Sequence, residues 1–278
     1  MLNLSEPNDS VAVSLLHELA GVIGALAWPA IALFVLIRYR GWIERFLPVL
    51  IEKFRSAESF EAWGVKLTAA KDLVEAAVNE PANRLEASRA VPEQQVKNAA
   101  TLNAQLQSSG ADQKIILVSV EEPVRRLAAE YESIRATMPH GPQRTVEMNR
   151  IMGSLRTLGI AAKPMLPKLT ISSNPGERLA AIAVLQTEPD ASYLRWLSER
   201  FQTERPFIFF HAALALRQFA LTRTYPDPQA MQTILEDALA RIEGYTGGDP
   251  DSNTLEVLHD ALRIMQQNAS QTGNYPTG

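Results

Sequence analysis

The sequence has no cysteine among its 278 residues. Disulfide bonds, thiolate nucleophiles, iron–sulfur clusters and cysteine zinc sites are therefore excluded. It also has no excess of basic residues, because 27 Lys and Arg against 31 Asp and Glu give a formal net charge of −4. Binding to a phosphate backbone needs clustered Lys and Arg, so this balance argues against a nucleic-acid partner.

Recognisable catalytic and metal-binding motifs are missing as well. The four histidines are His17, His140, His211 and His259, and no two of them have the spacing of metal ligands. No serine lies in a nucleophile elbow, and the glycine-rich stretch GYTGGDP lacks the lysine of a phosphate loop. We therefore expect a non-enzymatic protein without catalytic residues, cofactor site or metal site. His211, in the apolar stretch FIFFHAALAL, is interpreted as a core histidine.

One long uncharged run is present instead, at residues 19–37. A helix of this length covers roughly 28 Å, close to the hydrocarbon thickness of a bilayer. The run predicts a single transmembrane helix with a local kink at Pro29, which membrane helices tolerate. A cleaved signal peptide is the main alternative. The residues before the run contain Glu6, Asp9 and Glu18 but no Lys or Arg, whereas a signal peptide begins with positive charge.

The flanking charges predict the orientation of this helix. Basic residues follow the run and only acidic ones precede it, so the positive-inside rule places residues 1–18 outside and the bulk of the chain in the cytoplasm. The expected location is the plasma (inner) membrane. The predicted membrane-interface residues are Arg38, Tyr39, Arg40, Trp42 and Arg45. Residues 38–56 predict a basic amphipathic helix at the headgroup boundary; packing on the cytoplasmic domain or on sister subunits is the alternative.

Small residues recur four apart within the predicted span. They are Ala20, Gly21, Gly24 and Ala25. This spacing lets two membrane helices approach closely, and it indicates a helix-packing face. The same spacing also occurs in spans that stay single, so a homo-oligomer is one of two open readings.

The cytoplasmic part predicts an all-α fold in several sections. Residues 57–110 suggest a helical stalk, the stretch SSGAD at 108–112 a boundary, residues 111–268 a helical domain and residues 269–278 a flexible tail. Ile115–Val120 could be a buried strand or a helix turn, because periodicity does not separate the two. A helix is expected from about Glu122 to Met138. Asn174 is the expected N-cap of a helix that begins at Pro175.

Two helical stretches in this domain match each other. PGERLAAIAVL begins at Pro175 and PFIFFHAALAL begins at Pro206, so that Ala181 matches Ala212 and Leu185 matches Leu216. This pattern resembles the inner helices of HEAT-like repeats. The resemblance covers about residues 175–222 and implies a stacked helix-pair scaffold, an α-solenoid whose concave face binds proteins. The alternative is an irregular helical bundle.

Arginines and glutamates gather around the turn MPHGPQ. The arginines are Arg135, Arg144, Arg150 and Arg156, and the acids are Glu130, Glu132 and Glu147. One interpretation is a structural ion-pair network. The other is a patch that docks an anion or a partner, because arginine forks suit carboxylates and phosphates. Arg178 near the start of GERLAA is treated in the same way, so the candidate docking residues are Arg135, Arg144 and Arg178.

Two functions follow as hypotheses. The first is a single-pass, membrane-anchored scaffold or adaptor whose cytoplasmic helical domain binds protein partners or self-assembles. The second is a membrane-perturbing effector, in which the cytoplasmic domain senses a signal and clusters the transmembrane helices. Pro29, the small-residue face and the basic amphipathic segment motivate the second hypothesis. The expected partners are the lipid bilayer and other proteins.

Overall fold

The computed structural model describes residues 57–80, 89–245 and 252–272. Every regular element in these residues is a helix and none is a strand, which confirms the predicted all-α class. The α-helices are α3 (Ala57–Val78), α4 (Glu93–Ser108), α5 (Gln113–Thr137), α6 (Pro142–Ala162), α7 (Leu166–Thr170), α8 (Pro175–Thr187), α9 (Leu194–Thr203), α10 (Pro206–Thr222), α11 (Pro228–Glu243) and α12 (Ser252–Thr272). Two short 3₁₀ helices, η2 (Lys163–Met165) and η3 (Ala191–Tyr193), precede α7 and α9.

None of the helices in the described ranges is long and apolar enough to cross a bilayer. The predicted transmembrane helix, residues 19–37, lies outside these ranges, as does the amphipathic segment 38–56. The same holds for the predicted interface residues Arg38, Tyr39, Arg40, Trp42 and Arg45 and for the helix-packing residues Ala20, Gly21, Gly24 and Ala25.

Polar side chains cap the N-termini of several helices. The Asn174 side chain accepts a hydrogen bond from the Gly176 amide at 2.7 Å, which confirms the predicted N-cap of α8. The Asp112 side chain accepts from the Ile115 amide at 2.9 Å and caps α5. Ile115–Val120 is therefore helical. The predicted start near Glu122 was wrong, because Pro123 lies inside α5 and does not begin it.

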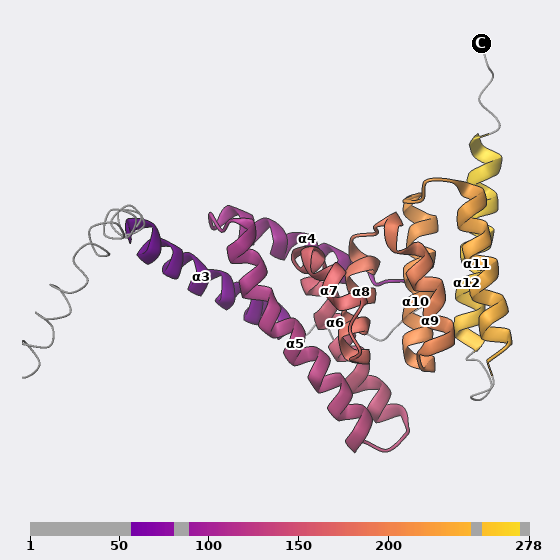
Figure 1. Ribbon diagram of the computed structural model, residues 1–278, viewed down its shortest axis with the longest axis horizontal. Helices are drawn as coiled ribbons and strands as arrows, with labels where there is room; N and C mark the ends of the chain where they lie inside the picture. Colours follow the sequence, from indigo (N-terminus) through magenta and orange to yellow (C-terminus); the bar gives the residue numbers. More distant parts are fainter. Residues whose placement is uncertain (1–56, 81–88, 246–251, 273–278) are drawn as a thin grey trace, which may run out of the picture. The chain divides into compact units, whose positions relative to one another are not determined.

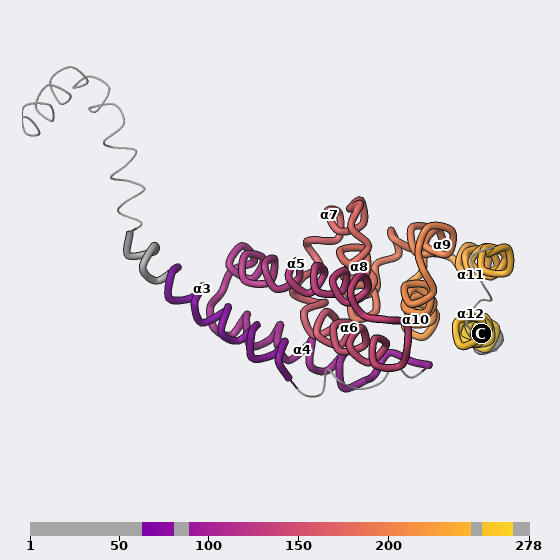
Figure 2. The backbone as a smooth tube through the Cα atoms, turned by 90° about the horizontal axis from the view of Figure 1, so that it is seen from below, coloured from indigo at the N-terminus to yellow at the C-terminus, as the bar shows by residue number. Residues whose placement is uncertain are grey.

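The helices from α5 to α12 pack in two layers within the unit Trp63–Gly278. In the inner layer α6, α8, α10 and α12 each contact the next, and Figure 1 shows α10 and α12 running alongside each other. In the outer layer, α5 covers α6 and α8, α7 covers α8, α9 covers α10 and α11 covers α12. Figure 2 shows α9 and α11 side by side above α10 and α12. Since each inner helix is followed by a returning outer element, the inner helices begin at the same edge.

Apolar residues from both matched stretches fill the centre of this unit. Ala181 and Leu185 of α8 and Ala212 and Leu216 of α10 are fully buried. Val74 of α3 and Leu102 and Leu106 of α4 belong to the same hydrophobic cluster. The structure therefore differs from the predicted division at 108–112, because α4 packs on α6 and shares a core with the helices that follow.

Candidate functional site

A pocket of about 670 Å³ lies at the edge where α6, α10 and α12 begin. Four arginines line it, together with His140 and three aromatic residues. We call it the arginine pocket and define it by Arg89, Arg135, His140, Arg144, Arg205, Phe207, Phe210 and Tyr245. The volume falls in the range of small-ligand sites, roughly 300–1,000 Å³.

The described residues that line the arginine pocket carry an excess of positive charge. Neither Asp nor Glu is among the described residues that line it. Arg89 has a carboxylate partner, since its Nη1 lies 2.5 Å from Glu256 Oε2 outside the lining. Arg135, Arg144 and Arg205 have no carboxylate within the described part of the chain at ion-pair distance. Among the described residues, three guanidinium groups therefore face this cavity without an ion-pair partner, and one of them, Arg135, also lines the neighbouring pocket that contains Glu132 and Glu204.

Neutral groups hold two of these guanidiniums in place. Arg144 is 8% exposed, and it donates to the Met138 carbonyl at 3.4 Å and to His140 Nδ1 at 3.0 Å. Because arginine can only donate, this contact is a hydrogen bond in which His140 Nδ1 is the acceptor. Arg135 lies over the Tyr131 ring, 5.7 Å from its centroid, and donates to the Tyr131 hydroxyl at 3.3 Å. Burial raises the pKa of the Tyr131 phenol, so this partner stays uncharged.

The positions of two arginines oppose the electrostatics of their own helices. Arg205 is the N-cap of α10, and Arg144 lies in the first turn of α6. The N-terminus of a helix carries about half a positive elementary charge, so cations there are unfavourable and anions favourable. No side chain caps either helix, whereas Asp112, Asn174 and Asp227 cap α5, α8 and α11. A bound anion would satisfy the arginines and the helix ends together.

The structure separates the two interpretations of the arginine cluster around the turn MPHGPQ. The ion pairs there belong to Arg150, whose guanidinium contacts Glu130 and lies 3.1 Å from Glu147 Oε2. Arg135 and Arg144, two of the three candidate docking residues, line the arginine pocket together. Sequence reasoning missed Arg205. Its position directly before the helix-starting Pro206, where a polar cap is expected, was the available signal.

Arg178, the third candidate docking residue, is placed differently. Its guanidinium contacts both carboxylate oxygens of Glu204, with Nη2 at 3.1 Å from Oε2, and its Nη1 donates to the Ser172 carbonyl at 2.8 Å. The Glu204 side chain is only 2% exposed. Arg178 lines a neighbouring pocket of about 400 Å³, which also contains Glu132 and Arg135. Its charge is therefore compensated, in contrast to the charges in the arginine pocket.

A buried polar cluster lies behind the aromatic wall of the arginine pocket. Arg156 is fully buried and donates to Gln186 Oε1 at 2.5 Å, to Gln95 Oε1 at 2.8 Å and to His211 Nδ1 at 3.2 Å. Gln186 in turn donates to the His211 carbonyl at 2.6 Å. The His211 ring packs against Phe207 and Phe210, with ring centroids 4.5 and 5.3 Å apart. The core placement predicted for His211 thus agrees with its burial.

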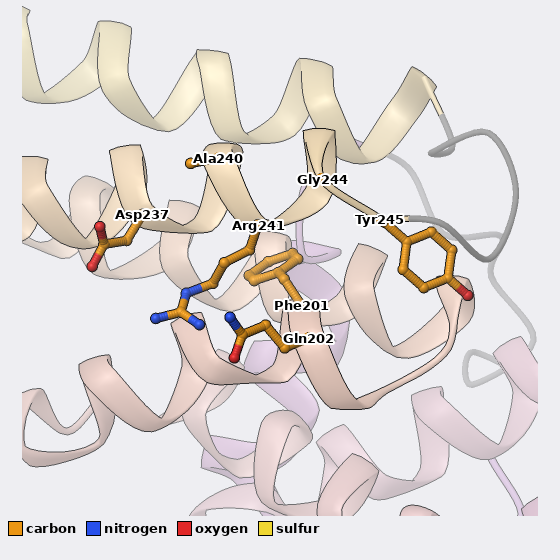
Figure 3. Close-up of a pocket in the computed structure, with 7 residues that line it drawn as sticks. All are labelled: Phe201, Gln202, Asp237, Ala240, Arg241, Gly244 and Tyr245. Carbon is orange, nitrogen blue, oxygen red and sulfur yellow. The ribbon is translucent and has the colours of Figure 1, made fainter.

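A second pocket of about 530 Å³ lies between α9 and α11. Figure 3 shows Arg241 reaching from α11 toward Gln202 of α9, while Tyr245 lies at the other end of the pocket. Asp237 is on the same helix as Arg241, so this pocket contains both signs of charge. It does not have the convergence of uncompensated cations that distinguishes the arginine pocket.

Comparisons with protein-family models, with curated proteins and with solved structures found no match. Within the described ranges, no group of three or more His, Asp or Glu side chains is placed to hold a metal ion. The function is therefore inferred from the geometry of the arginine pocket together with the sequence.

Proposed function

We propose that the chain is a non-enzymatic, membrane-anchored adaptor whose helical domain recognises an anionic group in the arginine pocket. The single observation that carries this proposal is the lining itself, in which Arg135, Arg144 and Arg205 face one cavity and form no ion pair with a carboxylate of the described residues. Guanidinium groups suit phosphates and carboxylates, because the planar fork donates two parallel hydrogen bonds.

The unfavourable position of Arg205 at the N-terminus of α10 supports a binding role for the pocket. A helix is normally stabilised by an acidic or small polar residue at its beginning, and α10 has Arg205 there. Residues that reduce the stability of their own element are expected where function requires them. Arg205 fits this description, since its side chain makes no hydrogen bond or ion pair with any described part of the chain.

The proposals of a membrane anchor and of a helix-pair scaffold are supported by features outside the arginine pocket. The uncharged run at residues 19–37 and the basic residues after it support a single-pass anchor with the helical domain in the cytoplasm. The two-layer packing of α5–α12 supports a stacked helix-pair scaffold of the HEAT-like kind. Such a scaffold has an extended surface for protein partners, and the arginine pocket lies at one edge of it.

A capping substitution tests the anion-binding role. In the ligand-free protein, Arg205→Ser provides a normal N-cap for α10 and removes a cation from the helix end. We expect it to stabilise the chain by about 1 kcal/mol, roughly a 2 °C rise in melting temperature. Pyrophosphate should raise the melting temperature of the wild type, because a ligand of the folded state stabilises it. The same substitution should remove most of that rise.

The measurement is thermal unfolding of the full chain in detergent, with pyrophosphate compared against chloride at equal ionic strength. Arg195→Ser is the matched control. Arg195 also lies in the first turn of a helix, α9, but its side chain is 89% exposed and outside the arginine pocket. An equal response of the wild type to both salts, or an unchanged pyrophosphate response in Arg205→Ser, would rule the anion site out.

The membrane-perturbing effector remains a second proposal. In this case the arginine pocket would be the receptor of the signal, and occupation of the pocket would cluster the predicted spans. The specific observations in its favour are the four small residues Ala20, Gly21, Gly24 and Ala25 and the proline at position 29. The anion site is common to both proposals, and the consequence of binding differs.

A further inference from the structure

We infer that the ligand of the arginine pocket is a nucleotide with two or more phosphate groups. The inference rests on the proposed function, since it names the class of anion that the pocket takes. The structural basis is the combination of aromatic rings with three guanidinium groups that form no ion pair with any described residue, in a cavity of about 670 Å³. A ligand that satisfies both must be strongly anionic in one part and planar in another.

The cationic part of the pocket is formed by the end of α5 and the beginnings of α6 and α10. Arg135, Arg144 and Arg205 lie there, and the first amides of α6 and α10 have no side-chain cap. Phosphate groups are the anions that helix N-termini and arginines bind together most readily. Three arginines that form no ion pair with a described carboxylate match the several negative charges of a di- or triphosphate better than the single charge of a carboxylate.

The aromatic part is formed by α10 and by the residue that follows α11. Phe207 and Phe210 are half-buried and pack on the edge of the His211 ring at 4.5 and 5.3 Å. Tyr245 packs edge-on against Phe209, with centroids 5.1 Å apart. The rings are therefore held in position before any ligand binds, which reduces the entropy that binding must overcome. In proteins that bind single-stranded nucleic acids, bases bind to such aromatic side chains by stacking on their faces.

A polar side chain beside the rings suits the edge of a base. Asn149 of α6 lines the same cavity, and its amide can both donate and accept hydrogen bonds. An acidic peptide would engage the arginines but would leave the three rings without a planar partner. The nucleotide therefore uses more of the lining than the peptide does.

The experiment measures binding to the full chain in detergent by isothermal titration calorimetry. The probes are ATP, GTP, pyrophosphate, adenosine and a polyglutamate peptide, each at the same ionic strength. At least one nucleotide should bind more than tenfold more tightly than pyrophosphate. Arg205→Ser should weaken both nucleotide and pyrophosphate, on the order of 10- to 100-fold for one lost charge-assisted contact.

Substitution of an aromatic residue distinguishes the contribution of the aromatic part of the pocket to binding from that of the cationic part. Phe210→Ala should reduce nucleotide affinity to about the level of pyrophosphate and leave pyrophosphate affinity unchanged, and Tyr245→Ala is the second variant in case the first fails to fold. Arg195→Ser should change neither affinity.

If the nucleotides bind no more tightly than pyrophosphate, the nucleotide inference fails while the anion site stands. If polyglutamate alone binds, the ligand is an acidic protein segment. If no probe binds, the inference and the proposed function fail together.

Discussion

Arg156 is a fully buried guanidinium whose hydrogen-bond partners are neutral. Its partners Gln95, Gln186 and His211 come from α4, α8 and α10, so one side chain of α6 joins four helices. Burial lowers the pKa of Arg156 to about 9, which leaves it charged at neutral pH. An acceptor on His211 is available only while the imidazole is neutral. Burial, and to a lesser extent the charge of Arg156, lowers the pKa of His211 well below 6.5.

This arrangement predicts a loss of stability in mild acid. Below pH 6.5 the unfolded chain takes up a proton at His211, while the folded chain does not until the pH reaches the lowered pKa. The unfolded state then binds more protons, so stability falls as the pH decreases through this window, by up to about 1.4 kcal/mol per pH unit. Urea unfolding between pH 8 and pH 5 measures the slope.

A substitution at the same position isolates the contribution of His211 from the other histidines. His211→Asn keeps an acceptor for Arg156 and does not titrate. We expect it to be less stable than the wild type at pH 8, because a buried ring is lost, but to have a shallower dependence on pH between 6.5 and 5. Identical slopes in the two proteins would show that His211 does not govern the pH dependence.

At the scale of the elements, one contact between helices leaves no room for a side chain. Gly176 in the first turn of α8 approaches the backbone of α5 so closely that a Cβ atom would lie 2.2 Å from the Ala128 carbonyl oxygen. Backbone cannot move aside as the end of a flexible side chain can. The distance between α5 and α8, and with it the position of the outer helix over the inner layer, therefore depends on glycine at this position.

Gly176→Ala should accordingly displace α8 from α5 and destabilise the unit by about 1–3 kcal/mol. Gly64→Ala is the matched control, because nothing lies within 4 Å of a Cβ atom at Gly64 in α3. Alanine is the better helix former, so the control should be neutral or more stable by up to about 1 kcal/mol. Chemical denaturation of both variants gives the comparison. A cost in Gly176→Ala no larger than in the control would contradict the close approach.

Local sequence signals predicted where helices begin better than they predicted how the helices pack together. Asn174 followed by Pro175 marked the start of α8 because a cap acts within one turn. Asp112 is the same kind of signal for α5, ten residues before the predicted start near Glu122, and the sequence interpretation did not use it. The arginine pocket could be predicted only in part. Arg135 and Arg144 are nine residues apart in the chain, whereas Arg205 reaches them only because α10 begins at the same edge as α6.

At the scale of the whole molecule, the membrane anchor is the prediction with the widest consequences. If residues 19–37 span the bilayer, the full chain should stay with the membrane fraction after washing with alkaline carbonate. Added protease should digest the C-terminal helical domain only in opened cells, since the basic flank predicts a cytoplasmic location for it. A chain lacking residues 1–56 should lose the membrane association and serves as the control. Release of the full chain by carbonate would contradict the anchor.

Because the inner helices run in the same direction, adding further helix pairs to the stack would change the charge of one edge. Each added pair of helices would bring one more helix beginning to the same side of the stack. A longer chain built on this plan would add one partial positive charge to that side for each new inner helix, and a capping side chain such as Asn174 of α8 would occupy some of the new helix ends. Duplication of a helix pair would extend the edge at which the inner helices begin. Substitutions at that edge would then determine which anions bind there.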